Sequence, residues 1–497
     1  MKSLRRAALT ALTALGLAAA PAAQAADLKI GNFLDVRSWD PALSDIGFSG
    51  PYLSAIYDPL IAMNAEGEAI PALATDWSYS DDFKTLTMHL REDVTFSDGE
   101  PFNAEAAVIN LNHLKNGPLS NEAYLKVAEF RATGPYTIEI ELTARDDSMV
   151  YLMALARSYM ASPASIEADS LKSEPIGSGP YTLDMERSIP GSEYHFNKVA
   201  DHWDAGTYKF DNLSVYPILD ATARNNAMLS GQINVNFGAA DNLQQAELAG
   251  WNIAQAPASW VGLQFVDRTG ETLEPLGDVR VRQALNLAFN RAGMLSTISS
   301  GAGEVTNQVF VVGGEVNDPA LLEDWAYDLE RAKQLMADAG YADGFDVSMP
   351  MSPIFAPWQP IVTQTLSQLN INVTWDDLQM PDYQINAPNY PMFICVLSLD
   401  LNPPAALIRQ VTSAQWFNPR QQYAEFPELK ELADAALAAT GDEQVEAMHA
   451  VNAKLTELGW WSIWYQAANS YFSTPDIEMQ AVTGYMFPPL RFIQPAS

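Results

Sequence analysis

Between residues 73 and 114 the apolar positions first alternate with polar ones and then follow a helical period. The alternation around Trp77 and again over residues 86–90 predicts two half-buried strands. Ser-Asp-Gly at residues 97–99 favours a tight turn, and Asn103 supplies a side-chain oxygen that can cap a helix. The segment therefore predicts strand, turn, strand, turn and helix, in that order.

The rest of the chain continues with strands and helices in alternation. Alternating apolar positions predict strands at residues 28–33, 136–142, 213–217, 233–237, 260–265, 345–350, 371–375, 392–397 and 460–466. Apolar residues at the helical period predict helices at residues 121–129, 149–160, 220–230, 278–291, 357–369, 428–439 and 443–458. This alternation favours an α/β fold.

The N-terminus has the three parts of a secretory signal peptide. Three basic residues fall within the first six, an uncharged apolar run covers residues 7–20, and an Ala-x-Ala pattern ends at Ala25. The run is shorter than the ~20 residues that a membrane-spanning helix needs. Cys395 is the only cysteine, so no lipid-anchoring cysteine follows the signal and no intrachain disulfide can form. We therefore predict removal of residues 1–25 and a soluble periplasmic protein without a lipid anchor.

The charge of the chain argues against several kinds of partner. Acidic residues number 61 and basic residues 28, which gives a formal net charge of −33. Such a charge repels nucleic acids and anionic membrane surfaces. The 497 residues are enough for two or three domains, and an apolar share of 48% is that of a folded protein.

Candidate catalytic chemistry is sparse. The five histidines show no HExxH spacing, no Gly-x-Ser-x-Gly is present, and the glycines at 177 and 179 lack the lysine of a phosphate-binding loop. We therefore predict that the protein is not an enzyme and has neither cofactor nor metal site. Two alternatives stay open: a glycosidase-like pair among the 61 acidic residues, and His195 with His202 as metal or haem ligands.

Three blocks of sequence carry a family resemblance. Residues 73–114 contain Leu-Ala-x-x-Trp, His-Leu-Arg and Asp-Gly-x-Pro-Phe in that order. The other two blocks are residues 278–291, which form an amphipathic helix, and residues 327–341. The blocks resemble the extracellular solute-binding proteins of ABC importers, in the peptide, nickel and opine class. The resemblance extends over essentially the whole mature chain.

The resemblance implies two α/β lobes joined at a hinge, with the ligand in the cleft between them and a smaller α+β domain inserted. It divides the chain into a signal peptide at 1–25, a first lobe at 27–60, 175–260 and 475–497, an inserted domain at 61–174, and a second lobe at 261–474. The implied function is capture of a small solute, such as a peptide or another amine-bearing compound, by a monomer that delivers it to an ABC permease. A secreted hydrolase on this scaffold and a ligand-sensing partner of a membrane receptor are the alternatives.

Asp400 is the first candidate for a ligand contact. Peptide-binding members of the family hold the ligand's amino group with an aspartate four residues before a proline, and Pro404 puts Asp400 at that position. An ammonium on this carboxylate would form a charge-assisted hydrogen bond. A turn or helix-capping role is the alternative. The family's usual Gly-Trp just before is Val396-Leu397 here, and Leu397 and Ser398 are further candidates.

The charges around Asp400 suggest a class of ligand. Residues 334–408 contain seven aspartates and no lysine, arginine or histidine, so Arg409 or Arg420 would have to reach in to meet a ligand carboxylate. We hypothesise a ligand that is cationic or lacks a free carboxylate. The general acidity of the chain explains the run equally well.

Aromatic residues in predicted strands and loops complete the candidates. The full set of predicted ligand contacts is Asp400, Phe33, Leu34, Trp260, Leu397, Ser398, Trp416, Trp464 and Tyr465. On the predicted strand 460–466, Trp464 and Tyr465 point to opposite faces, so one face should be core and the other could meet a ligand. For each aromatic residue, core packing is the more common role.

Overall fold

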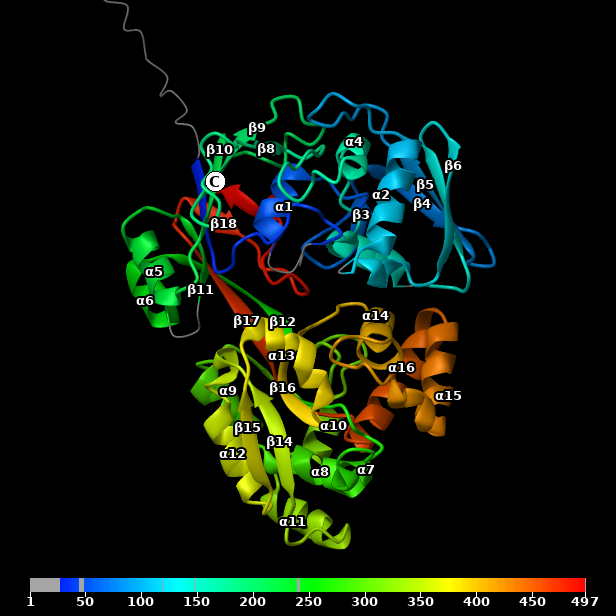
Figure 1. Ribbon diagram of the computed structural model, residues 1–497, viewed down its shortest axis with the longest axis vertical. Coiled ribbons are helices and arrows are strands. Elements are labelled where there is room, and N and C mark those ends of the chain that lie inside the picture. Colours follow the sequence, from blue (N-terminus) through cyan, green and yellow to red (C-terminus); the bar gives the residue numbers. More distant parts are fainter. Residues whose placement is uncertain (1–26, 44–48, 119, 147, 239–241, 497) are drawn as a thin grey trace, which may run out of the picture.

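The computed structural model describes residues 27–43, 49–118, 120–146, 148–238 and 242–496. The predicted signal peptide lies outside these residues. The described chain forms two lobes, one above the other in Figure 1, and the predicted two-lobed α/β fold is confirmed. Within the described ranges no helix is both long and apolar enough to cross a bilayer.

One nine-stranded sheet runs through both lobes. Its strand order is β16, β12, β17, β11, β1, β10, β9 and β8, with β13 paired to β17. The strands are β16 (Met392–Ser398), β12 (Asn252–Phe265), β17 (Trp461–Ser473), β11 (Val235–Gly238), β1 (Asp27–Asn32), β10 (Asn212–Pro217), β9 (Tyr194–Lys198), β8 (Tyr181–Leu183) and β13 (Gly303–Val305). β1 is parallel to both β10 and β11, so these three strands end at one edge of the first lobe.

β12 and β17 are the strands that pass from one lobe to the other (Figure 1). They pair antiparallel, and β17 also pairs with β11 in the first lobe while β12 also pairs with β16 in the second. Their register shifts between Pro257 and Ser259. Proline has no N–H to give to the ladder, so this rung is weaker than its neighbours. The irregularity lies where the sheet leaves the first lobe.

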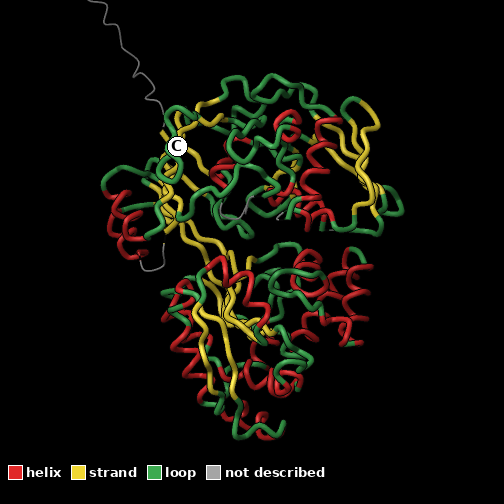
Figure 2. Tube along the Cα trace, viewed as in Figure 1, coloured by secondary structure: helices red, strands yellow, loops and turns green. Residues whose placement is uncertain are grey.

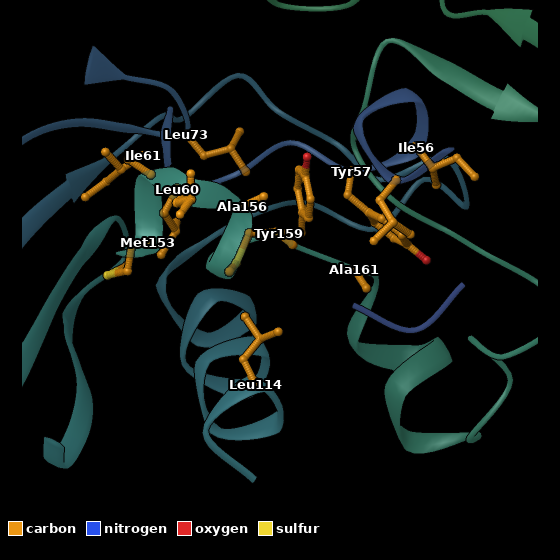
Figure 3. Packing of buried hydrophobic residues seen from close by; sticks show 14 of the residues in the cluster. Ile56, Tyr57, Leu60, Ile61, Leu73, Leu114, Met153, Ala156, Tyr159 and Ala161 are labelled. Atoms are coloured by element: carbon orange, nitrogen blue, oxygen red, sulfur yellow. The ribbon is translucent and has the colours of Figure 1, made fainter. Parts of the chain in front are cut away.

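The first lobe and the inserted domain share one hydrophobic cluster. Their other elements are α1 (Gly50–Ile56), α5 (Ala221–Leu229), α6 (Leu243–Ala249), β18 (Ile477–Met479), β19 (Ile493–Pro495), β2 (Ile61–Met63), β3 (Ala69–Pro71), β4 (Ala74–Tyr79), β5 (Thr85–Leu90), α2 (Ala104–Asn116), β6 (Val127–Gly134), β7 (Thr137–Leu142), α3 (Met149–Leu152) and α4 (Pro163–Glu167). Figure 3 shows part of this cluster, in which Tyr57, Tyr159 and Leu114 come from separate segments of the chain.

The second lobe has its own hydrophobic cluster, and helices lie on either side of its strands (Figure 2). Its other elements are α7 (Glu274–Gly277), α8 (Val279–Ala288), α9 (Arg291–Ile298), α10 (Pro319–Asp324), α11 (Leu329–Asp338), β14 (Asp346–Met351), α12 (Gln359–Ser367), β15 (Asn372–Asp377), α13 (Met380–Asn386), α14 (Pro403–Leu407), α15 (Pro427–Ala438) and α16 (Gly441–Glu457). β14 and β15 pair in parallel. The residue boundaries of the lobes given above stay a prediction.

The stretch at residues 73–114 folds as predicted. β4 and β5 pair antiparallel within the four-stranded sheet β4-β5-β7-β6, and the Asn103 side chain accepts the Ala106 N–H at 2.9 Å to cap α2. The helix predicted at 121–129 is wrong beyond Tyr124, because the chain enters β6 and completes the sheet against β7. The helix predicted at 149–160 is interrupted, since α3 ends at Leu152 and Ala156 has a positive φ of 60°.

A buried carboxylate joins the end of α1 to the segments before β8 and before β10. Asp58 accepts hydrogen bonds from Trp203 Nε1 at 2.9 Å and from Ser178 Oγ at 3.1 Å. His202 Nε2 lies 3.1 Å from the same carboxylate, and its Nδ1 accepts the Asp204 N–H. Nε2 is therefore the protonated nitrogen and donates to Asp58. All of these donors compensate for burying the charge.

We expect Asp58→Asn to destabilise the protein by about 3 kcal/mol, because the amide turns an N–H group toward donors in a buried site. Urea unfolding of both proteins measures the change. Asp76→Asn is the matched control, since Asp76 also pairs with a histidine, His89, but both side chains are more than half exposed. It should change stability by less than about 0.5 kcal/mol. Equal effects of the two substitutions would contradict the role of Asp58.

The loop after β16 is a direct contact between the lobes. The Leu401 N–H donates to Tyr151 Oη at 2.9 Å, across from α3. The Leu401 side chain packs against the first-lobe cluster, and Ala405 of α14 belongs to that cluster. A Cβ added to Gly67, whose φ is +86°, would lie 2.2 Å from Leu401 Cδ1. The second lobe thus touches the first through residues that follow the end of β16.

Tyr151→Phe removes the acceptor of the Leu401 N–H and keeps the ring. A partly buried N–H left without its acceptor costs about 1 kcal/mol, so we expect the Leu401 amide to exchange hydrogen roughly fivefold faster. Hydrogen–deuterium exchange measures this rate. Amides of β16 that are paired with β12 serve as the internal control and should be unaffected. If the Leu401 rate stayed the same, the hydroxyl would not hold this contact.

Candidate functional site

The first lobe presents the carboxyl ends of β1, β10 and β11 at one edge, and ligands of open α/β sheets bind outside such edges. Phe33 and Leu34 follow β1 here and are half-buried. Phe33 packs on Phe237, with ring centroids 4.5 Å apart. Arg224 lies 6.0 Å from the Phe33 ring and donates to the carbonyl oxygen of Ile218 at 2.7 Å. Burial lowers the pKa of Arg224 to about 10, so it stays charged at neutral pH.

In the second lobe, Asp400 and Arg409 form an ion pair just beyond the end of β16. Arg409 Nε and Nη2 lie 2.8 and 2.6 Å from Asp400 Oδ2. Arg409 Nη2 also donates to the carbonyl oxygen of Ser398 at 2.5 Å, and Gln410 Nε2 lies 3.4 Å from the same oxygen. Asp400 is only 3% exposed, so its charge is compensated in a nearly dry environment.

Asp400 lies at the seam between the lobes. Its neighbour Leu401 is bound by Tyr151 of the first lobe. Burial, and then the charge of Asp400, raises the pKa of Tyr151 well above its usual value, so the phenol stays protonated. A Cβ on Gly484, in the loop after β18, would lie 3.4 Å from Tyr151 Oη and 3.8 Å from the Leu399 carbonyl oxygen. Three distant segments of the chain therefore meet around Asp400.

The sequence left open that Asp400 caps a helix instead of binding a ligand, but another residue caps the helix that follows it. The side chain of Asn402, not Asp400, accepts the Ala405 N–H at 2.8 Å and caps α14. Of the two cations that could reach in, Arg409 lies on Asp400, whereas Arg420 binds Asp267 at 2.9 Å. The structure thus brings Asp400, Ser398 and Arg409 together and leaves Arg420 elsewhere.

Four other predicted contacts lie in the second-lobe core: Trp260, Leu397, Trp464 and Tyr465. Trp260 packs against Trp461 with centroids 6.0 Å apart, and Trp464 against Phe289 at 4.9 Å. Tyr465 Oη accepts the Trp358 Nε1–H at 2.9 Å. Both faces of β17 are buried in this lobe, because elements cover the sheet on each side. These four side chains therefore belong to the packed core of the second lobe.

Trp416 differs from these, since it is 40% exposed and stacks on Phe393 with ring centroids 5.9 Å apart.

The sequence did not predict two residues that lie near the seam between the lobes. Met486 approaches both connecting strands: its Sδ lies 3.6 Å from Ser259 Oγ, and its carbonyl oxygen accepts from Asn469 Nδ2 at 3.1 Å. Tyr151 is 250 residues from the amide it binds, and no local pattern marks either residue.

The histidines considered as metal or haem ligands have other contacts. His202 is buried on Asp58, and His195 Nδ1 lies 3.0 Å from Ser214 Oγ. Among the residues that the structure describes, no three His, Cys, Asp or Glu side chains form a metal-binding group. Cys395 is buried, and burial raises its pKa well above the usual value, so its thiol is unreactive.

Known proteins resemble this chain in sequence and in fold. The glutathione-binding protein GsiB of Escherichia coli (strain K12) is 29% identical over 372 residues, which are 72% of this chain and 71% of that protein. GsiB of Salmonella typhi is 28% identical over 371 residues, with the same coverage. Among solved structures, the periplasmic binding protein AgaA of A. tumefaciens R10 in complex with agropinic acid superposes with a TM-score of 0.81, at 20% identity, over 95% of this chain and 99% of that one.

A second solved structure, the periplasmic binding protein DppA of Helicobacter pylori in complex with the peptide STSA, gives a TM-score of 0.80 at 18% identity, over 94% of this chain and 98% of that one. At these identities the two structures show a shared fold. Proteins of this kind bind small molecules or peptides and work with ABC importers. Residues 68–419 match the family described as bacterial extracellular solute-binding proteins, family 5 (middle). The chain belongs to the bacterial extracellular solute-binding proteins of family 5.

Proposed function

We propose that this protein captures a small amine-bearing solute of peptide size between its lobes, with Asp400 as the anchor for the ammonium. The observation that carries the proposal is the position of Asp400. It is a buried carboxylate beyond a strand end, at the seam where the second lobe touches Tyr151 of the first. A carboxylate in such a place is matched to a cationic group that arrives between the lobes.

Peptide size is supported by the relatives. The glutathione-binding proteins match this chain at 28 to 29% identity over 72% of its length. Glutathione is a tripeptide with one ammonium group, which suits a single carboxylate anchor. Family membership supports solute binding rather than the hydrolase considered from the sequence. We therefore propose a protein that binds its ligand without converting it.

Closure of the lobes would deliver the solute. The register shift between Pro257 and Ser259 gives the connecting strands a place to bend while the ladders on both sides persist. A ligand that contacts both lobes favours the closed state by its extra contacts there. In this proposal the mature protein is a periplasmic monomer, released from its signal peptide, and it docks transiently on the permease of an ABC importer.

We expect amine-bearing peptides to raise the melting temperature of the refolded, ligand-stripped mature protein. A ligand at a hundredfold excess over Kd stabilises by about 2.7 kcal/mol. A thermal-shift screen with glutathione, short peptides, polyamines, opines, oligosaccharides and metal chelates measures this. Asp400→Asn should abolish the shift, because the neutral amide cannot anchor an ammonium.

Asp267→Asn is the matched control for that substitution. Asp267 is also a buried aspartate paired with an arginine, Arg420 at 2.9 Å, but its bonds lie within the second lobe. This variant should melt at a lower temperature and keep the full ligand shift. A shift of the same size in Asp400→Asn, or a response to oligosaccharides or chelates alone, would sink the anchor assignment and leave the fold assignment unaffected.

A further inference from the structure

Asp400 and Arg409 form an ion pair in which the carboxylate is buried and the arginine is partly exposed to solvent. Both guanidinium contacts, at 2.8 and 2.6 Å, are made to Oδ2 of Asp400. The side chain of Asp400 is buried, whereas 16% of the Arg409 side chain is exposed. The pair is electrically neutral, and a solute meets the arginine at least as readily as the carboxylate.

A neutral pair restricts the ligands that suit it. A ligand that brings only an ammonium leaves two cations beside one buried carboxylate, and a ligand that brings only a carboxylate leaves the opposite imbalance. A ligand that brings both charges can place its ammonium on Asp400 and its carboxylate on Arg409. The charges then alternate and the site stays neutral. A guanidinium also matches the geometry of a carboxylate with two parallel donors.

We infer that Asp400 and Arg409 together recognise an α-amino-acid head group, in which the ammonium and the carboxylate are bonded to one carbon. The two side chains touch each other, with 2.6 Å between Arg409 Nη2 and Asp400 Oδ2, so a ligand whose two charges lie side by side can meet both at once. The ends of an α-linked dipeptide lie on separate Cα atoms about 3.8 Å apart, and those of longer peptides are farther apart. A γ-linked peptide or a free amino acid has the required head. This inference rests on the proposed function, because it needs Asp400 to be the ligand anchor.

The inference replaces the hypothesis of a cationic ligand or one without a free carboxylate. That hypothesis came from the absence of cations in residues 334–408. Arg409 is the first residue after this stretch, and it folds back onto Asp400 nine positions earlier. The cation for a ligand carboxylate is therefore present beside the anchor, and the acidic run does not describe the charge of the site.

Three peptides test the inference by isothermal titration calorimetry on the refolded mature protein. Glutathione carries its ammonium and one carboxylate on the same carbon of a γ-linked glutamate. Its α-linked isomer, Glu-Cys-Gly, has the same atoms and charges without that head group. The third peptide is glutathione with the α-carboxylate of its glutamyl residue amidated. We expect glutathione to bind at least tenfold more tightly than either of the others.

Substitutions of Arg409 then test whether this residue causes the tighter binding of glutathione. Arg409→Gln should reduce the preference for glutathione to within about twofold, and Arg409→Lys should keep part of it. Arg420→Gln is the matched control and should keep the whole preference, since Arg420 binds Asp267 instead. Because Arg409→Gln leaves Asp400 without its arginine, the neutral double variant Asp400→Asn with Arg409→Gln is measured as well. It should bind glutathione more weakly than the wild type and without preference.

The outcomes separate the two proposals. If Asp400→Asn weakens all three peptides but the preference persists in Arg409→Gln, the inference is overturned and the proposed function stands. Equal binding of glutathione and its α-linked isomer by the wild type also overturns the inference alone. If none of the three peptides binds, the inference is overturned and the thermal-shift screen decides the proposed function. If Asp400→Asn binds the peptides as tightly as the wild type, the proposed function fails together with the inference.

Discussion

The pairing of β12 with β17 is the constraint on which both lobes depend. Each lobe completes its sheet with a part of these two strands, through β11 in the first lobe and β16 in the second. Neither lobe can lose the pair without exposing a row of backbone groups. The register of the pair shifts between Pro257 and Ser259 and again between Val261 and Gly262.

Buried arginines bind backbone oxygens at the start of β17 in the second lobe. Arg268 donates to the Trp460 carbonyl oxygen at 2.9 Å and stacks on that indole, and Arg291 donates to the Ile463 carbonyl oxygen at 2.9 Å. Burial lowers the pKa of Arg291 to about 10, so the charge survives at neutral pH. These hydrogen bonds to carbonyl oxygens tie the two side chains to backbone positions. β17, which connects the two lobes, is thereby anchored to the second lobe.

Local patterns in the sequence predicted the elements that local forces form. Strands β4 and β5 and the cap of α2 at Asn103 follow from alternation, turn residues and one side-chain oxygen within a few positions. The helix expected at 121–129 failed because β6 exists only by pairing with β7. The site is harder to predict for the same reason. Asp400 was found through resemblance. Tyr151 binds the N–H of the next residue, Leu401, across 250 residues, and such contacts leave no trace in a local window.

Two buried aspartates of the second lobe differ in the groups that hold them. Asp267 accepts N–H groups from Glu271, Thr272 and Leu273 at 2.7 to 2.9 Å. Burial alone would raise the pKa of Asp267, and these hydrogen bonds lower it below the usual value instead. The stability that this charge contributes is fully present at a pH above the pKa of Asp267 in the unfolded chain. It is lost as the pH falls through the lower pKa of Asp267 in the folded protein.

Backbone donors of this kind cannot leave Asp267 unless the loop unfolds. At Asp400 the partner 2.6 Å away is the side chain of Arg409, which can adjust by rotating about its own bonds without unfolding the loop. A ligand that meets Asp400 therefore meets a carboxylate whose partner is a side chain, whereas one that met Asp267 would have to displace backbone donors. The backbone donors on Asp267 fit a stabilising role, and the side-chain partner of Asp400 is consistent with the binding role proposed for it.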